Sequence, residues 1–369
     1  MFDFEPVSKI VNDSIGNRLF PGAAISVCHK AKPLLRHYAG RKTYVPWSGK
    51  VDRFAFFDLA SLTKPLVTVL SIMVLVDKKQ LCLDDRLISF FDNVPRDKHA
   101  ITVQQLLSHA SGLPAHEPFY HTKYMPHFNQ DARRIEAACR LIFSLPLAYE
   151  PGSRAVYSDL GYMILGRIVE KITGSHLFDF ASRQIFIPCG LEGLSWQKGP
   201  NHIAQGAVPT GFCHLRKRIL MGEVHDQNAW LLGGAAGHAG LFGTLEAVER
   251  LLLLLTRAYR EGDEIFPVSR RTLRSFINTR GIPAGSTWCL GFDSPSPTDS
   301  SAGRFFSPNS IGHLGYTGGS FWIDLDQDLM VILLSNRTFP FDSSDSKGKI
   351  RLFRQRLHDT IRTCMGLDA

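Results

Sequence analysis

Cysteine is scarce in this sequence, and no two cysteines form a C-x-x-C pair. The chain has 369 residues and 7 cysteines, at positions 28, 82, 139, 189, 213, 289 and 364. An odd number of widely separated cysteines argues against a disulfide framework. We therefore expect reduced, mostly buried thiols in a cytoplasmic protein.

Long hydrophobic runs are absent as well. The longest apolar stretch, Pro65 to Val76, is far shorter than the roughly 20 residues that a membrane helix needs. The first residues, Met1 to Pro6, lack the basic start and apolar core of a signal peptide. We expect no membrane span.

Neither sign of charge is concentrated in one long block. The formal net charge of +8 is spread along the chain, and the densest basic stretch is Lys347 to Arg362. This stretch predicts an amphipathic helix with four apolar residues on one face: Ile350, Phe353, Leu357 and Ile361. Basic faces of surface helices usually only meet solvent, so we expect no nucleic-acid partner.

The length and the hydrophobic content of 44% allow one large domain with a sizeable core. Strand patterns lie near both ends, and helical patterns fill the middle. We expect an α+β fold: one antiparallel sheet built from both termini and flanked by helices, with an inserted helical lobe. The whole chain, 1–369, would be one domain, with an α/β lobe over about 1–60 and 240–369 and a mainly helical lobe over about 61–239. The predicted elements are helices at 7–19, 62–79, 132–145, 160–172 and 245–260 and strands at 23–29, 34–40, 312–316, 321–325 and 329–334.

The run Ser61-Leu62-Thr63-Lys64 is the most informative feature. In a helix that starts near Ser61, residues three apart share a face, so the hydroxyl and the amine would meet. A serine hydroxyl needs a neighbouring base to become a nucleophile, and a buried lysine favours its neutral form. The S-x-x-K pattern occurs in acyl-transfer serine enzymes, but four residues also match by chance. The alternative is a capped helix with a solvated lysine.

Two later segments are candidates for the rest of such a site. Tyr157-Ser158-Asp159 follows the turn signal at Glu150-Pro151-Gly152, which places the phenol on a loop before a helix. His313-Leu314-Gly315-Tyr316 predicts a strand edge where glycine permits close approach of a substrate. Taken alone, the first could be a packed tyrosine and the second a simple bulge.

In this order, Ser61-x-x-Lys64, Tyr157-Ser158-Asp159 and His313-x-Gly315 resemble the three motifs of the serine β-lactamase and penicillin-binding-protein superfamily. The chain is most similar to the class C β-lactamases and the related esterases and D-amino-acid peptidases. The resemblance covers roughly residues 18–362 and includes three further segments: Phe20 to Ala24, Leu106 to Pro114 and Gly233 to Phe242.

The resemblance implies the β-lactamase/transpeptidase fold and a role for each motif residue. Ser61 would be the acylated nucleophile, Lys64 the amine that deprotonates and positions it, and Tyr157 a phenolate or proton relay. The backbone N–H groups of Ser61 and Tyr316 would form the oxyanion hole. Lys64 and Tyr157 should titrate together. The family needs no metal and no cofactor.

Two positions depart from the lactamase pattern. Asp159 stands where those enzymes carry asparagine, and His313 where they carry the lysine of Lys-Thr-Gly. Both changes disfavour anionic β-lactams by charge. Asp159 would either bind an amine or hold Lys64, and both alternatives stay open.

The histidine spacings match no metal-ligand pattern. His109 and His238 are expected to be structural. The neighbouring pair His225-Asp226 is a candidate for lining the cleft.

We therefore expect a metal-free serine hydrolase working through an acyl-enzyme on Ser61, most similar to a carboxylesterase. A D-alanyl or D-amino-acid peptidase, or a β-lactamase, is the alternative among enzymes. A ligand-binding pseudoenzyme is the alternative outside them. The expected partner is a small ester, amide or β-lactam-like molecule, and the oligomeric state stays open.

Overall fold

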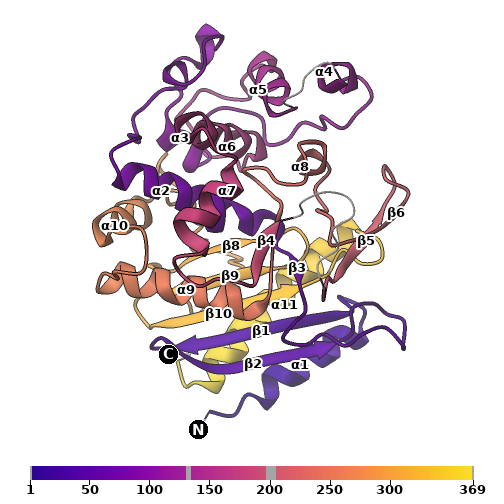
Figure 1. The fold of residues 1–369 in the computed structure, drawn as a ribbon. Helices are drawn as coiled ribbons and strands as arrows, with labels where there is room; N and C mark the ends of the chain where they lie inside the picture. Colours follow the sequence, from indigo (N-terminus) through magenta and orange to yellow (C-terminus); the bar gives the residue numbers. More distant parts are fainter. Residues whose placement is uncertain (1, 130–133, 197–204, 368–369) are drawn as a thin grey trace.

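The computed structural model describes residues 2–129, 134–196 and 205–367. Its centre is a five-stranded antiparallel sheet in the order β2-β1-β10-β9-β8. The strands are β1 (Gly22–His29), β2 (Lys32–Gly40), β8 (Ile311–Leu314), β9 (Ser320–Asp324) and β10 (Leu329–Ser335). Strand β1 pairs with β10 from Ala23 opposite Ser335 to His29 opposite Leu329. The predicted sheet built from both termini is therefore confirmed (Figure 1).

Helices cover both faces of this sheet. On one face, α1 (Glu5–Gly16) and α11 (Ser344–Cys364) pack against each other and against the sheet (Figure 1). This layer is held by apolar side chains such as Val11, Val27 and Leu357, which are fully buried. On the other face, α9 (Leu245–Arg260) contacts β1 and β10. The apolar stripe of α11 that the sequence predicts is buried as expected.

The mainly helical part lies above α9 in Figure 1. Its helices are α2 (Leu70–Asp77), α3 (Val103–Leu107), α4 (Met125–Asn129), α5 (Arg134–Ser144), α6 (Asp159–Thr173), α7 (Leu177–Ala181), α8 (Gln227–Leu231) and α10 (Arg270–Asn278). Two small sheets join the parts: β3 (Phe57–Asp58), β7 (Leu241–Gly243) and β4 (Leu194–Trp196) form one, and β5 (Pro209–Cys213) and β6 (Arg218–Met221) form the other. Short 3₁₀ turns occur at Ala60–Leu62, Leu87–Ser89 and Arg96–Lys98, and π-helical turns at Lys64–Val69 and Ser182–Phe186.

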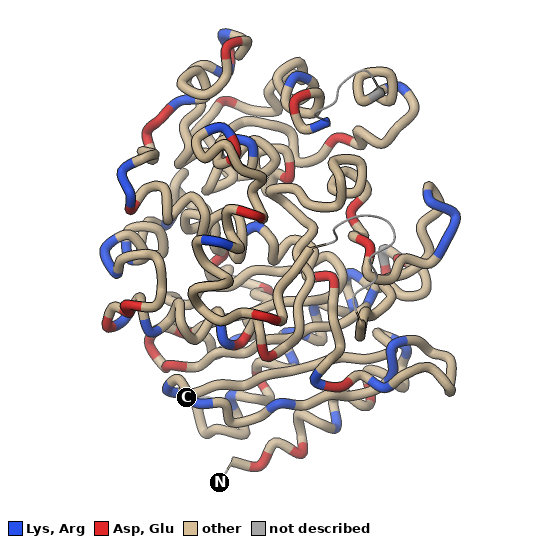
Figure 2. The backbone as a smooth tube through the Cα atoms, viewed as in Figure 1, with Lys and Arg blue, Asp and Glu red and all other residues tan. Residues whose placement is uncertain are grey.

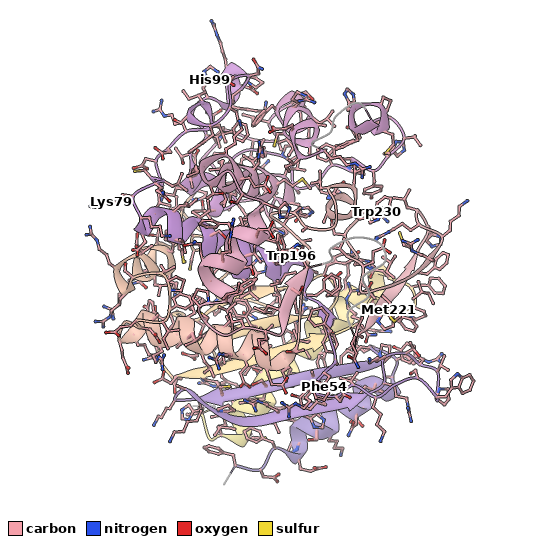
Figure 3. The ribbon with its side chains drawn as sticks, viewed as in Figure 1. Phe54, Lys79, His99, Trp196, Met221 and Trp230 are labelled. Carbon is pink, nitrogen blue, oxygen red and sulfur yellow. The ribbon has the colours of Figure 1, made fainter. Side chains whose placement is uncertain are left out.

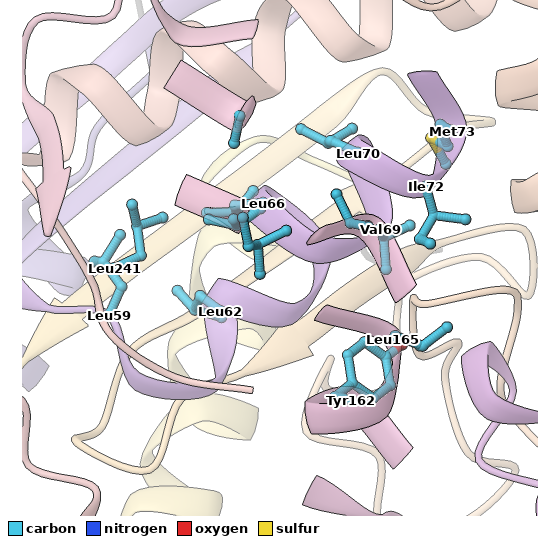
Figure 4. Packing of buried hydrophobic residues seen from close by; sticks show 14 of the residues in the cluster. Leu59, Leu62, Leu66, Val69, Leu70, Ile72, Met73, Tyr162, Leu165 and Leu241 are labelled. Atoms are coloured by element: carbon cyan, nitrogen blue, oxygen red, sulfur yellow. The ribbon is translucent and has the colours of Figure 1, made fainter. Parts of the chain in front are cut away.

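The segment that carries Ser61 runs through the core, but it is not the single α-helix that the sequence predicts over 62–79. A 3₁₀ turn holds Ser61, a π-helical turn follows, and α2 completes the run. Pro65 contributes to this break, because it has no N–H to donate. Leu66, Val69 and Leu70 pack among Leu59, Tyr162 and Leu241 (Figure 4).

Within the described residues, Ala60–Asp77 is the one helical stretch whose length and apolar composition would suffice to span a bilayer. However, 83% of it is buried inside the protein. This is the burial of a core helix. The helix predicted at 132–145 corresponds to α5, which begins at Arg134. The first two positions of that prediction, 132–133, lie outside the described residues.

Candidate functional site

Ser61 sits in a tight turn between β3 and the core helix. Ala60, just before it, has φ of +47°, a left-handed conformation that costs free energy for a residue with a side chain. The buried Asp58 carboxylate holds this turn by accepting the N–H groups of Ala60 at 2.8 Å and of His225 at 2.7 Å. Burial raises the pKa of Asp58 to about 6, although these two hydrogen bonds oppose the rise. The first N–H groups of such a turn have no partner within it, so that of Ser61 is available to a ligand.

Lys64 is fully buried and lies beside the serine hydroxyl. Its Nζ is 3.1 Å from Ser61 Oγ, 2.7 Å from Asp159 Oδ1 and 3.3 Å from the carbonyl oxygen of His238. Burial alone lowers the pKa of Lys64, but the Asp159 carboxylate and Tyr157 more than reverse this, and the net pKa is raised. Burial alone would favour the neutral amine, and the ion pair with Asp159 opposes this. The lysine is an ammonium held by an ion pair.

Tyr157 lies on the loop ahead of α6, as the sequence predicts. Ser158 caps that helix by accepting the Gly161 N–H at 3.2 Å. Lys64 Nζ lies 4.6 Å from the centre of the Tyr157 ring. Burial raises the pKa of Tyr157, while the charge of Lys64 and hydrogen bonds with Lys64 and Ser61 lower it, and the net shift is upward. At rest, Tyr157 is a phenol in contact with both residues.

Asp159 is the first residue of α6, and its position decides between the two roles left open. Its Oδ1 binds Lys64, and its Oδ2 is 3.7 Å from His116 Nδ1. Burial raises the pKa of Asp159, but Lys64 and His116 lower it by more than this. The net pKa is depressed, so the carboxyl is ionised. Asp159 holds Lys64, and the pair adds little net charge to the cleft.

Strand β8 delivers the third motif to the serine. Gly315 follows this strand, and a Cβ built on it would come within 2.9 Å of the Leu59 carbonyl oxygen. Only glycine therefore lets β8 lie this close to the turn that carries Ser61. No hydrogen bond inside the described part of the chain uses the Tyr316 backbone N–H. Ser61, Tyr157, His313, Gly315 and Tyr316 together line a cavity of about 330 Å³.

His313 is buried and carries no charge. Its Nδ1 is 3.0 Å from the Leu314 carbonyl oxygen, which requires the proton on Nδ1 and leaves Nε2 as an acceptor. In the described part of the chain, this Nε2 has no partner. Burial, and then the charge of Lys64, lower the pKa of His313 to about 3. The motif thus supplies no cation here, in agreement with the sequence.

The other histidines divide as the sequence suggests. His109 is buried, accepts the Ser158 N–H on Nδ1 at 3.0 Å and packs 4.6 Å from the Tyr157 ring, so it positions that tyrosine's loop. His238 lies 2.9 Å from Asp226 through Nε2. His225 and Asp226 line a second cavity of about 440 Å³, which also contains Ser61 and Tyr157. In the described ranges, no three His, Cys, Asp or Glu side chains are placed to hold a metal.

Five polar or aromatic residues of the first cavity were missed by the sequence analysis: Trp288, Asp293, Arg337, Lys347 and Arg354. Trp288 and Asp293 come from an irregular segment without periodicity, so the sequence held no signal for them. Arg354 and Lys347 belong to α11. Arg354 lies on the apolar stripe of that helix, one turn after Ile350. A charged residue at a position expected to be buried is unusual and could have indicated a functional role from the sequence.

Arg354 and Lys347 supply positive charge to the cavity that the third motif, with His313 in place of lysine, does not. Arg354 is 5% exposed and donates to the carbonyl oxygens of Gly315 at 3.3 Å and Gly319 at 2.7 Å. Burial and the charge of Arg337 lower the pKa of Arg354 to about 9, which leaves it charged at neutral pH. Lys347 is exposed at the rim of both cavities, with Nζ 4.9 Å from the centre of the Tyr316 ring.

Known proteins share this fold and sequence pattern. The sequence model of the β-lactamase family matches residues 7–354. A protein of Escherichia coli (strain K12) named "Putative D-alanyl-D-alanine carboxypeptidase" is 32% identical over 314 residues, which cover 78% of this chain and 70% of that protein. The octameric penicillin-binding protein homologue from Pyrococcus abyssi has a TM-score of 0.73 at 19% identity, over 99% of this chain and 78% of that one. EstCE1, a hydrolase with promiscuous acyltransferase activity, has a TM-score of 0.72 at 19% identity, over 95% of this chain and 97% of that one. At such identity these two structures establish a common fold.

Proposed function

The chain belongs to the β-lactamase family and is a serine hydrolase, and we propose that it removes a C-terminal residue with a free carboxylate from a short D-peptide. This places the alternative of a D-alanyl peptidase ahead of the carboxylesterase that the sequence favoured. The non-enzyme alternative falls with membership in this hydrolase family. The name of the Escherichia coli relative agrees with a D-alanyl carboxypeptidase.

Arg354 carries this proposal. It is a buried guanidinium, and no carboxylate in the described part of the chain pairs with it. Its Nε has no hydrogen-bond partner there either. A buried charge without a counter-ion is costly, and a substrate carboxylate in the cavity would supply the missing partner. The cavity is shared with Ser61, so a carboxylate held there lies beside the scissile bond.

Lys347 adds a second cation at the mouth of the same cavity. Its ammonium is exposed, and no carboxylate pairs with it in the described ranges. Arg337, a third cation of the lining, is already paired with Asp342 at 2.8 Å. A C-terminal carboxylate would thus meet Lys347 on entry and Arg354 when bound.

The protonation states favour a relay through Tyr157. Ser61 Oγ attacks the carbonyl carbon, and its proton moves to the Tyr157 oxygen while the phenolic proton passes to the leaving nitrogen. The C–N bond breaks and an acyl-enzyme forms on Ser61. Lys64 keeps its proton and stabilises the partial negative charge that develops on the Tyr157 oxygen while it exchanges protons, and the N–H groups of Ser61 and Tyr316 stabilise the oxyanion. Water then attacks the acyl group, its proton passes through Tyr157 back to Ser61 Oγ, and the product is released.

A carboxylesterase remains the second candidate, because one observation favours it. His313 is neutral and Trp288 lies beside it, with ring centres 5.7 Å apart, so these two side chains offer an uncharged surface. A small neutral leaving group would fit this surface without using Arg354. Such a substrate would need only Ser61, the relay and the oxyanion hole.

The decisive experiment compares N-acetyl-D-alanyl-D-alanine with its C-terminal amide. We expect D-alanine release from the acid to exceed cleavage of the amide in kcat/KM by at least about tenfold, equivalent to ~1.4 kcal/mol. Lys347→Gln, on an exposed side chain, should reduce this ratio, and Arg354→Gln should reduce it further. p-Nitrophenyl acetate and a chromogenic cephalosporin serve as the competing substrates. Cleavage of the ester alone would replace the peptidase by the esterase, and efficient cephalosporin hydrolysis would indicate a lactamase.

A further inference from the structure

Five large apolar side chains stand exposed on neighbouring loops beside the cleft. Trp47 is 86% exposed, Phe54 67%, Phe341 62%, Ile219 51% and Met221 43%. Trp47 and Phe54 lie between β2 and β3, Ile219 and Met221 on β6, and Phe341 after β10. Single exposed apolar residues are common, but five on adjacent segments are not explained by packing.

Contacts between their residues join these segments into one face, here called the loop face. Ile219 lies opposite Phe212 across the β5–β6 ladder, and Met221 follows on the same side of the strand. The Phe212 and Phe341 ring centres are 6.0 Å apart. At the base of the hairpin, Asn336 donates at 2.9 Å to the carbonyl oxygens of Lys42 and Pro209. The β5–β6 hairpin projects from the protein in Figure 1, and Figure 3 places Phe54 below Met221.

The loop face is also strongly basic. Residues 41–54, 209–221 and 336–341 contain eight Lys or Arg residues and a single acid, Asp52. Glu223 pairs with Arg216 and Arg218, and Asp342 pairs with Arg337. The remaining five have no carboxylate partner in the described ranges: Arg41, Lys42, Lys50, Arg53 and Lys217. Basic residues mark the tip of the hairpin and the loops below it in Figure 2.

We propose that the loop face binds the surface of an anionic lipid bilayer. Its apolar side chains stand on separate loops with cations between them, which suits insertion among lipid headgroups better than a flat protein partner. Tryptophan has an apolar ring and a polar N–H and prefers the membrane–water interface. Anionic headgroups supply the negative partners that these five basic residues lack within the protein.

This position would turn the mouth of the cleft toward the membrane. Phe341 directly precedes Asp342, which accepts a hydrogen bond from the Tyr316 hydroxyl. Tyr316 and Lys347 line both cavities that contain Ser61. The inference does not rest on the peptidase reaction, because it uses only surface residues outside the catalytic contacts.

The test is co-sedimentation of the full chain with vesicles. We expect binding to vesicles of equal parts phosphatidylglycerol and phosphatidylcholine, little binding to pure phosphatidylcholine, and weakening by salt. Trp47→Ser and Ile219→Ser should each reduce the partition constant at least about threefold through lost apolar contact, and Lys217→Glu should reduce it similarly through charge.

Matched controls come from elsewhere on the surface. Ile187→Ser removes an apolar side chain that is 70% exposed, and Arg271→Glu makes the same charge change on exposed α10. Both should bind like the parent, and labelling of every variant by a fluorophosphonate shows that it is folded. Absence of binding to the anionic vesicles would overturn the proposal. Equal losses of vesicle binding in the two control variants would also overturn it. If binding depended on Lys217 but not on Trp47 or Ile219, the partner would be a general polyanion such as nucleic acid, and the proposal would again fail.

Discussion

The Asp159 carboxylate lies 2.7 Å from the Lys64 ammonium, within a site where Lys64 also contacts Ser61 Oγ at 3.1 Å. This ion pair fixes the protonation state of the catalytic centre. In the relay proposed above, Lys64 keeps its proton, so the proton of Ser61 needs another acceptor, and the Tyr157 hydroxyl is in contact with both groups. Asp159 therefore acts through Lys64.

The first prediction concerns the stability that this pair provides. Asp159→Asn leaves the fully buried Lys64 ammonium without its counter-ion. We expect a loss of about 2–3 kcal/mol in the free energy of unfolding, below the full value for a buried pair because Asp159 is partly exposed. Urea denaturation of the variant measures this directly. Adding Lys64→Met should recover part of the loss, whereas additive losses in the double variant would contradict a coupled pair.

The sign of the pH dependence follows from Asp159. Lys64 depresses the pKa of Asp159 in the folded protein. The ionised carboxylate therefore stabilises the fold above the usual pKa of an aspartate, and this stabilisation is lost as the pH falls from there toward the folded pKa. Between pH 5 and 2 the parent should lose more stability than Asp159→Asn, as thermal unfolding across that range would reveal.

The second prediction is that Lys64 and Tyr157 work as one unit. Lys64→Ala and Tyr157→Phe should each lower kcat by roughly 10²–10⁴-fold, the range expected when acid–base catalysis is lost. The double variant should be little slower than the slower single one, because each change disables the same relay. Single-turnover acylation with a p-nitrophenyl ester gives the rates. Losses that multiply would show two independent functions.

The sequence predicted the motif-bearing parts of the site and much of the scaffold. Ser61, Tyr157 and Gly315 line one cavity, and the sequence had placed them by local signals: the start of a helix, the loop before a helix and a strand edge. The charge of Lys64 could not be predicted in this way. It depends on Asp159, 95 positions away in the sequence, and the direction of a buried lysine's pKa depends on whether such a partner is present.

The cationic wall was missed for a similar reason. Arg354 occupies a position on α11 that faces the sheet, and only the three-dimensional packing shows that it reaches the Ser61 cavity without a carboxylate partner. Trp288 and Asp293 lie on an irregular segment, where neither helical nor strand periodicity constrains which way a side chain points.

The third prediction uses Asp293 as a titrating group in the same cavity. Burial raises its pKa to about 6, against hydrogen bonds from Thr287 and the Ser294 N–H that favour the anion. The carboxyl is neutral below that pH and negative above it. A negative charge in the cavity repels a substrate carboxylate, so KM for an acidic peptide should rise between pH 5 and 7.

The matched variant is Asp293→Asn, in which this rise should disappear. Kinetics with the C-terminal amide should show little of the effect in either protein, since that substrate has no carboxylate to repel. An identical pH profile in the parent and in Asp293→Asn would assign the titration to another group.

The last prediction tests the close approach of β8 to the Ser61 turn. In Gly315→Ala the new Cβ would come within 2.9 Å of the Leu59 carbonyl oxygen, a backbone atom that cannot rotate away. Strand β8 must then move, and the Tyr316 N–H moves with it. We expect a loss of about 10²-fold in kcat, as for the removal of one oxyanion donor, with a smaller change in KM. Gly348→Ala is the control, because nothing lies within 4 Å of its added Cβ and alanine favours the helix. If Gly315→Ala turned over substrate like Gly348→Ala, the Tyr316 N–H would not stabilise the oxyanion.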